Sequence, residues 1–151
     1  MKLFLVLVGF CFSQNQSTVF AGLIAEISSQ NFRYGYMHHF TAGEVVNFDL
    51  KLSYDKRSFV EAKQFITVAL HFKTSPDQFY FFTGPSIGIN PGQRHNSNRL
   101  FDGYGLFSIN SGFALKLDEW FFSAAYDNVI LTNQYFGGSG QFEIGYSFDL
   151  F

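Results

Sequence analysis

The sequence contains little charge and almost no cysteine. Lys, Arg, Asp and Glu make up 15% of its 151 residues, whereas a soluble domain usually carries about 25%. The formal net charge is −2 and the basic residues form no block or stripe, so the composition argues against a nucleic-acid-binding protein. The one cysteine, Cys11, lies in an N-terminal leader. Without that leader the chain has no disulfide, no thiolate metal site and no cysteine nucleophile.

Long hydrophobic runs are also scarce. Beyond the N-terminus the sequence has no stretch of about 18 apolar residues, which excludes a transmembrane helix there. Apolar side chains are nevertheless abundant, because aromatic residues reach 21% and 22 residues are phenylalanine. Numerous apolar residues that are interrupted at short intervals by polar ones are typical of membrane-spanning β-strands.

The leader, residues 1–13, has the pattern of a cleaved secretory signal peptide. Lys2 supplies a positive charge, and the short apolar core that follows cannot span a bilayer as a helix. Cleavage before Gln14 would leave residues 14–151 as one exported domain. A buried N-terminal strand is the alternative. A lipid anchor on Cys11 is disfavoured, because a bulky residue precedes the cysteine.

The C-terminal stretch, residues 141–151, alternates strictly between apolar and polar residues. The apolar positions are Phe142, Ile144, Tyr146, Phe148 and Leu150, and the positions between them are Gln141, Glu143, Gly145, Ser147 and Asp149. Successive side chains of a strand point to opposite faces, so this pattern gives one apolar and one polar face. Such a final strand is typical of outer-membrane β-barrels, in which it closes the sheet onto the first strand.

Seven earlier segments repeat this alternation. The predicted strands are residues 19–27, 32–40, 46–55, 62–73, 78–90 and 100–117, a seventh that begins at Trp120, and the closing strand 141–151. Each is long enough to cross a bilayer when tilted, which takes roughly 9–11 residues. The weakest alternation is in the first segment, and Gly84, Pro85 and Gly88 predict a bend or bulge in the fifth.

The predicted connections also differ in length. Those after the third, fifth and seventh strands are longer and polar, and they cover residues 56–61, 91–99 and 133–139. The connections after the second, fourth and sixth strands are short. Outer-membrane barrels have short periplasmic turns and longer extracellular loops, so the connections agree with the alternation of the strands.

These observations predict an all-β fold, an eight-stranded antiparallel up-and-down transmembrane β-barrel. Unpaired backbone amides are costly in lipid, so only a closed sheet remains once helices are excluded. Eight strands enclose a lumen that side chains fill, and charges of both signs would pair there. The side chains predicted to point inward are those of Arg33, His39, Asp49, Lys51, Lys63, His71, Glu143 and Asp149. The aromatic residues predicted at the membrane interfaces are Trp120, Tyr126, Tyr34 and Tyr36.

A soluble protein is the alternative. A lipocalin-like periplasmic binding protein or a β-sandwich would turn the same apolar faces inward and expose the polar ones. The strand lengths, the low charge content, the excess of phenylalanine and the closing strand favour the membrane protein.

The closing strand resembles the assembly signal that the barrel insertion machinery reads. The matching positions are Glu143, Gly145, Phe148 and Leu150, although Phe151 departs from the pattern because the apolar series ends one residue earlier. The chain after residue 13 resembles small outer-membrane barrels of the OmpX and OmpA-domain type, and its Phe, Tyr and Asn content resembles that of Bacteroidetes members. This resemblance implies an outer-membrane location and contact with lipid and lipopolysaccharide.

A narrower resemblance covers about residues 80–151. Gly84–Gly92, Asp102-Gly103, Phe113–Leu117 and Asp118-Glu119-Trp120 are similar to the TraO family of Bacteroidetes conjugative-transposon proteins. This resemblance implies partners in a conjugal transfer apparatus. The closing strands are also similar to PorP/SprF proteins of type IX secretion, whose chains are much longer.

One candidate for catalysis lies on the longest predicted loop. His95 and Ser97 invite comparison with a barrel-type lipid A hydrolase, but such a triad needs a rigid support and an acid behind the histidine, and the loop sequence offers neither. His95 is instead expected to belong to a solvated polar loop. The charges of Arg94 and Arg99 in the same loop suit lipopolysaccharide phosphates, with simple solvation as the alternative. We therefore expect a non-enzymatic protein with a structural or interaction role and no cofactor or metal, with the lipid A hydrolase and the soluble binding protein as alternatives.

Overall fold

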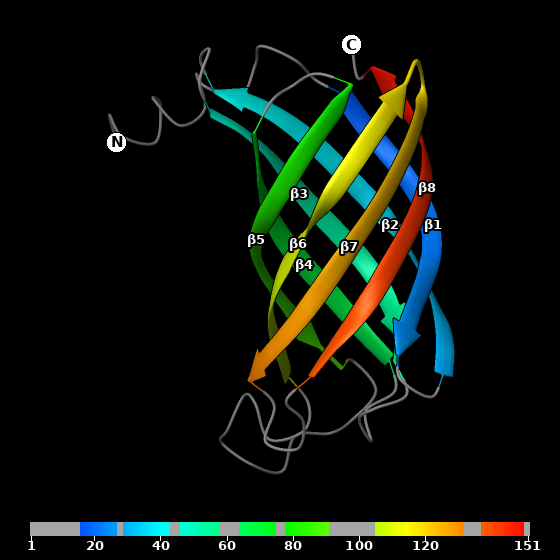
Figure 1. Cartoon of the computed structure of the whole chain (residues 1–151), viewed down its shortest axis with the longest axis vertical. Helices are drawn as coiled ribbons and strands as arrows, with labels where there is room; N and C mark the ends of the chain where they lie inside the picture. The colour runs from blue at the N-terminus through cyan, green and yellow to red at the C-terminus, as the bar shows by residue number, and fades with distance from the viewer. Residues whose placement is uncertain are drawn as a thin grey trace.

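The chain forms a closed barrel of eight antiparallel strands (Figure 1). The computed structural model describes residues 16–26, 29–42, 46–57, 64–74, 78–90, 105–131 and 137–149. The strands are β1 (Gln16–Glu26), β2 (Ser29–Ala42), β3 (Val46–Lys56), β4 (Gln64–Lys73), β5 (Phe79–Ile89), β6 (Gly105–Leu117), β7 (Trp120–Leu131) and β8 (Gly137–Asp149). This confirms the predicted fold class. Within these ranges, no helix is long and apolar enough to cross a membrane.

The first and last strands close the barrel. β1 pairs with β2 from Gln16 to Glu26, and its other edge pairs with β8, where Gln16 lies opposite Asp149. The blue and red strands therefore lie side by side in Figure 1. We call the end that carries Gln16 and Asp149 the terminal end, and the opposite end, where β1, β3, β5 and β7 finish, the loop end.

The predicted irregularity in the fifth strand is present. The ladder between β4 and β5 pairs Ala69 with Ser86 and resumes only at Phe72 and Thr83. Pro85 lies in this gap, and proline has no backbone N–H to donate to a ladder. On its other edge β5 pairs with β6 without interruption.

The side chains of the barrel are arranged inside out relative to a soluble protein. Along β8, from Gln141 to Ser147, the even-numbered side chains are exposed and the odd-numbered ones are buried. Phe142, Ile144 and Tyr146 are 56%, 47% and 44% exposed on the outer wall. Each of the remaining strands also contributes large exposed apolar side chains. A lipocalin-like arrangement would place these side chains in the lumen, so the structure has the opposite polarity.

Three strands start earlier than predicted. β1 starts at Gln16 and β2 at Ser29, each three residues before the predicted strand, and β8 starts at Gly137, within a predicted loop. In each case polar side chains extend the strand because the lumen accepts them: Thr18 and Ser139 are buried there. The predicted signal peptide, residues 1–13, lies outside the described residues.

The lumen is less polar than predicted. Two clusters of buried apolar side chains occupy it: Phe20, Met37, Tyr80, Phe82, Ala114 and Phe121 form one, and Phe65, Leu106 and Val129 form the other. The second cluster lies at the loop end, where β4 and β6 begin and β7 finishes. An eight-stranded lumen must be filled by side chains of some kind, and here large apolar side chains share that space with the charged ones.

The predicted aromatic girdles are only partly correct. Trp120 begins β7 at the terminal end, is 50% exposed and contacts Tyr146 edge-on, with ring centroids 5.9 Å apart. Tyr34, Tyr36 and Tyr126 instead lie near the middle of their strands. The pleat sets only the face on which a side chain lies, whereas its depth depends on where the strand ends.

Candidate functional site

The most distinctive feature of the described structure is a chain of buried charges across the lumen. Its members alternate in sign along the series Lys51, Glu143, Arg33, Asp55, Arg57 and Asp127. Each of these residues is at most 6% exposed. They come from β2, β3, β7 and β8, together with the residue directly after β3, so the series ties together distant parts of the wall.

The contacts at one end of this series centre on Glu143. The Nζ atom of Lys51 lies 2.5 Å from Glu143 Oε1, and the Nε atom of Arg33 lies 3.3 Å from the same oxygen. Ser123 donates a hydrogen bond to the other carboxylate oxygen over 2.8 Å. A buried carboxylate is tolerated only when such partners offset the loss of its hydration, and Glu143 has three.

The other end of the series reaches the loop end. Arg33 Nε lies 3.2 Å from Asp55 Oδ1, and Arg57 Nη2 lies 3.2 Å from Asp55 Oδ2 and 2.6 Å from Asp127 Oδ2. Thr67 also donates to Asp55, over 3.1 Å. Arg57 is 1% exposed, so its guanidinium closes the lumen from the loop end instead of pointing into solvent.

Neutral polar side chains accept hydrogen bonds from both terminal nitrogens of Arg33. One terminal nitrogen donates to Ser53 Oγ over 2.9 Å, and the other donates to the side-chain oxygen of Gln141. That oxygen also accepts a hydrogen bond from Asn110 over 2.9 Å. These contacts connect the guanidinium to β3, β6 and β8, so Arg33 is held from several sides of the barrel.

A second polar cluster lies at the terminal end. His39 Nδ1 lies 2.7 Å from Asp49 Oδ1, and His39 Nε2 lies 2.8 Å from Thr18 Oγ1. Ser147 Oγ is 2.8 Å from the same threonine oxygen, and Lys73 Nζ is 2.6 Å from Asp49 Oδ1.

The order hydroxyl, imidazole and carboxylate in this cluster is that of a hydrolytic triad. Thr18 is completely buried, however, and His39 is only 9% exposed. A substrate carbonyl therefore has no access to Thr18 Oγ1. In addition, the ammonium of Lys73 already neutralises Asp49. The cluster satisfies its own hydrogen bonds and fixes β1, β2 and β3 to β4 and β8 at this end.

The ionised side chains that pair in the described lumen are balanced. The positive ones are Arg33, Lys51, Arg57 and Lys73, and the negative ones are Asp49, Asp55, Asp127 and Glu143. Unpaired charges in an interior of low dielectric constant are strongly unfavourable. The balance therefore lets an apolar wall enclose a charged core.

The residues predicted for the lumen are mostly brought together. Arg33, Lys51 and Glu143 join one cluster, and His39 and Asp49 form the other. Asp149 does not join either, because it lies exposed at the rim of the terminal end; the prediction that it belongs to the lumen network is wrong. His71 is buried but stacks on Phe82, with ring centroids 4.6 Å apart.

Other predicted residues lie outside the described part of the chain. They are Lys63, Arg94, His95, Ser97, Arg99 and Leu150. Of the assembly-signal positions, Glu143 and Gly145 are buried and face the lumen, whereas Phe148 is half-buried on the outer side of β8.

Three members of the charged series were not predicted as lumen residues. Asp55 belongs to the polar face of the third strand but was not singled out. Arg57 follows β3 in a stretch that the sequence predicts as a solvated connection. Asp127 lies in a strand in which Ala125 and Tyr126 make the alternation of apolar and polar residues hard to recognise. Asp127 lies four residues after Ser123 and therefore on the same face of β7. This spacing alone would have predicted that Asp127 points into the lumen.

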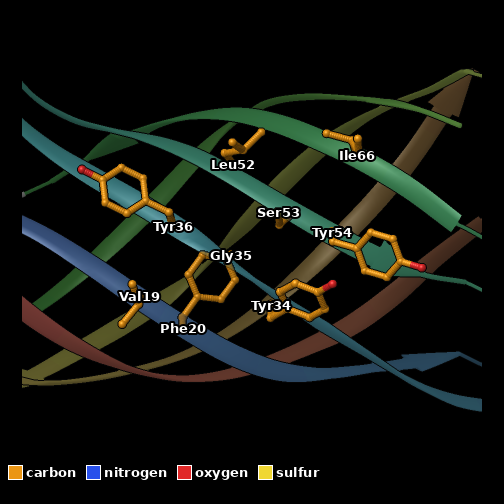
Figure 2. Close-up of a pocket in the computed structure, with 9 residues that line it drawn as sticks. All are labelled: Val19, Phe20, Tyr34, Gly35, Tyr36, Leu52, Ser53, Tyr54 and Ile66. Carbon is orange, nitrogen blue, oxygen red and sulfur yellow. The ribbon is translucent and has the colours of Figure 1, made fainter. Parts of the chain in front are cut away.

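The outer wall carries a groove over β1, β2 and β3, with Ile66 of β4 at one side (Figure 2). Its volume is about 540 Å³, and its lining is apolar apart from tyrosine hydroxyls and one serine. The lining residues are Val19, Phe20, Tyr34, Gly35, Tyr36, Leu52, Ser53, Tyr54 and Ile66. Within the described residues no group of three His, Cys, Asp or Glu side chains is placed to hold a metal ion.

Comparisons with known proteins identify the fold. The chain is similar to the outer-membrane protein Ail of Yersinia pestis in a phospholipid bilayer nanodisc, with 10% identity, a TM-score of 0.57, and coverage of 89% of this chain and 100% of that one. The N-terminal β-barrel domain of Pseudomonas aeruginosa OprF gives 15% identity and a TM-score of 0.56, over 89% and 98% of the two chains. A transmembrane β-barrel designed de novo gives 9% identity and a TM-score of 0.53, over 93% of this chain and 99% of that one.

Comparisons by sequence add nothing to this. No protein-family model matches the chain, and no curated protein matches it. The structural matches therefore support the resemblance to small outer-membrane barrels at the level of the fold, and the conjugative-transposon family stays a prediction. The described chain has the fold of a small transmembrane β-barrel.

Proposed function

We propose that this protein is a non-enzymatic outer-membrane β-barrel that acts as a rigid scaffold for contacts at its loop end. The observation that carries this proposal is the polarity of the barrel: large apolar side chains cover the outer wall, and a balanced set of charges is buried inside. A closed sheet with an apolar exterior satisfies every backbone hydrogen bond in lipid. In water the same exterior would be an extensive apolar patch that promotes aggregation.

The interior favours a scaffold over a pore. Phe65, Leu106 and Arg57 are at most 1% exposed at the loop end, and Tyr80 and Phe121 are buried in the apolar cluster farther along the lumen. Eight-stranded barrels enclose just enough space for such side chains. Ions would have to displace packed side chains and salt bridges to pass.

The loop end is the surface that we assign to partners. The two longest connections follow β3 and β5, and both leave the barrel at this end. Longer loops face outward in outer-membrane barrels, so we propose that the terminal end faces the periplasm. Arg94, His95 and Arg99 belong to the longer of the two connections, and guanidinium groups suit lipopolysaccharide phosphates. Export by a cleaved signal peptide and insertion by the barrel machinery, through Glu143, Gly145, Phe148 and Leu150, belong to the same proposal.

Fractionation tests this proposal. The protein with an epitope tag at a loop should be recovered with outer membranes, should resist extraction by carbonate, and should migrate faster on a gel before boiling than after it. A soluble periplasmic protein and an inner-membrane protein serve as markers. Recovery of the chain in the soluble periplasm would contradict the outer-membrane barrel.

The enzyme alternative has its own test. Lipid A from cells that express the wild type and the double variant His95→Ala/Ser97→Ala should have the same acyl chains if the barrel is not a hydrolase. A loss of acyl chains that depends on both residues would instead establish the lipid A hydrolase.

The finer assignment, to a conjugal transfer apparatus, rests on the resemblance in residues 80–151. Deletion of the gene should then lower the frequency of plasmid or transposon transfer, with growth and membrane integrity unchanged. Unchanged transfer, or genes unrelated to mating on both sides of this one, would limit the proposal to a general outer-membrane scaffold.

A further inference from the structure

We infer that the groove on β1, β2 and β3 binds one glycerophospholipid of the periplasmic leaflet, with an acyl chain along the groove and the phosphate next to His38. This inference rests on the proposed outer-membrane location. It concerns the lateral wall of the barrel and is independent of the partners proposed for the loop end.

The groove exists because the neighbouring side chains are drawn apart around Gly35. On one side Tyr34 and Tyr54 stack on each other, with ring centroids 5.2 Å apart. On the other side Tyr36 turns toward β1, where its hydroxyl lies 2.6 Å from Ser17 Oγ. Figure 2 shows Tyr36 pointing away from the other two rings, with Gly35 between them. The space that remains is long, apolar and open to the bilayer.

A polar group lies beside the groove, on the side of the terminal end, and joins it through Tyr36. Ser17 Oγ lies 2.6 Å from the Tyr36 hydroxyl and 2.9 Å from His38 Nδ1. Ser17 is completely buried beneath these two side chains. Polar groups that face lipid are costly unless they are paired, and here three interacting polar side chains gather beside the groove.

We assign the protons of this group so that Tyr36 donates to Ser17 and Ser17 donates to His38 Nδ1, an arrangement that the distances of 2.6 and 2.9 Å allow. The proton of the neutral imidazole then lies on Nε2. Nε2 has no hydrogen-bond partner within the described part of the chain. The wall therefore presents one N–H donor, and a phosphodiester oxygen is an acceptor of the required kind.

The depth of His38 agrees with a lipid head group. It lies four positions before Ala42, the end of β2 at the terminal end, which corresponds to about 13 Å along a tilted strand. Phe40 packs edge-on against His38, with ring centroids 4.4 Å apart, and stacks on Phe48, with ring centroids 4.9 Å apart. Aromatic side chains concentrate at the membrane–water interface, where phosphate and ester groups lie, and the groove runs from there toward the centre of the bilayer.

The test is native mass spectrometry of the refolded full-length barrel in detergent, titrated with 1-palmitoyl-2-oleoyl-phosphatidylethanolamine. Two variants probe the two parts of the site. Leu52→Trp fills the groove, and His38→Phe removes the N–H donor but keeps an aromatic contact with Phe40. Ile87→Trp is the matched control, since Ile87 is 47% exposed on the outer wall of β5, away from the groove. Gel migration before boiling confirms that each variant is folded.

We expect the wild type and Ile87→Trp to retain one phospholipid with equal affinity. Both groove variants should bind about tenfold more weakly, the loss expected for one hydrogen bond to a charged group or for a blocked cavity. Dioleoylglycerol, which lacks the phosphate, should bind the wild type and His38→Phe alike.

Several results would overturn the inference. They are unchanged binding by Leu52→Trp or His38→Phe, equal loss in Ile87→Trp, and a mass of two protein copies that Leu52→Trp abolishes, which would assign the groove to a second copy of this chain. Each can occur in a barrel that fractionates with outer membranes, so failure here is distinct from failure of the proposed location.

Discussion

Arg33 and Glu143 lie on strands that are not neighbours, yet their side chains meet 3.3 Å apart across Gly22. Gly22 of β1 is paired with Arg33 of β2 on one edge and with Glu143 of β8 on the other. The three residues thus form one row of the inner wall. A Cβ atom on Gly22 would lie 2.2 Å from the carbonyl oxygen of Phe142 and 2.9 Å from Cγ of Glu143, so only glycine leaves room for the ion pair to form over β1.

The first prediction concerns this glycine. Gly22→Val should prevent formation of a stable barrel, because its Cβ collides with backbone at the seam between β1 and β8. Ala21→Val is the matched control, since Ala21 is exposed on the outer wall of the same strand and a larger apolar side chain there meets only lipid. Gel migration of unboiled samples reports the folded fraction. Equal folding of the two variants would show that the seam tolerates a side chain.

The second prediction concerns the charge of Glu143. Glu143→Leu leaves Arg33 and Lys51 buried next to one another with one fewer partner, and breaking a buried pair in this way costs about 3–5 kcal/mol. Asp149→Asn should change the unfolding free energy by less than about 1 kcal/mol, because this carboxylate is exposed at the rim. Urea unfolding, followed by the fluorescence of the single tryptophan, Trp120, measures both.

The third prediction is that the cost of losing Glu143 is mainly one of unbalanced charge. The double variant Lys51→Met/Glu143→Gln removes one charge of each sign and restores the balance with Arg33 facing Asp55. It should be more stable than Glu143→Gln alone, although it lacks more native contacts. A double-mutant cycle with Lys51→Met gives the coupling energy. Additive losses would mean that the two side chains act independently.

The faces of the strands were predictable from the sequence, but the contents of the lumen were only partly so. A period of two assigns each side chain to one wall, and this placed Arg33, Lys51 and Glu143 correctly. It also placed Met37 on the face of Arg33 and His39. It could not show that Phe20 points inward, because the alternation of the first strand is weak. Phe20 lies against Gly35 of the adjacent strand, where a Cβ would be 2.8 Å from Cζ of the ring. Whether a large side chain lies next to a glycine depends on the register between the strands, and the alternation within one strand does not determine that register.

Partners across the lumen were likewise beyond the sequence. Arg57 and Asp127 are far apart in the chain and meet at 2.6 Å only after the barrel closes. Similarly, the polarity of Asp149 matched an inward position, but whether it was buried depended on where β8 ends relative to β1. The face on which each side chain lies could be predicted from the alternation within a strand. The ion pairs across the lumen could not, because they depend on how the closed barrel brings distant strands together.

The fourth prediction is that the barrel conducts no ions. Reconstituted in planar bilayers, the wild type should show no stable single-channel steps, because Arg57, Phe65 and Leu106 fill the loop end of the lumen. Arg57→Ala should not open a continuous pathway either, since Tyr80 and Phe121 remain packed beyond it. A general porin of larger strand number, reconstituted in the same way, controls for insertion. Regular conductance steps from the wild type would contradict a filled interior.

The fifth prediction concerns assembly through the closing strand. β8 pairs along both edges, with β1 and with β7, so the barrel cannot close until this strand is in place. The double variant Phe148→Ser/Leu150→Ser removes the last two apolar side chains that the insertion machinery is proposed to read, and its level in outer membranes should fall by about tenfold or more. Asp149→Asn lies between these positions, keeps the apolar series intact and should assemble at the wild-type level. Quantitative immunoblots of isolated outer membranes compare the three proteins, and normal levels of the double variant would remove the assembly role assigned to these residues.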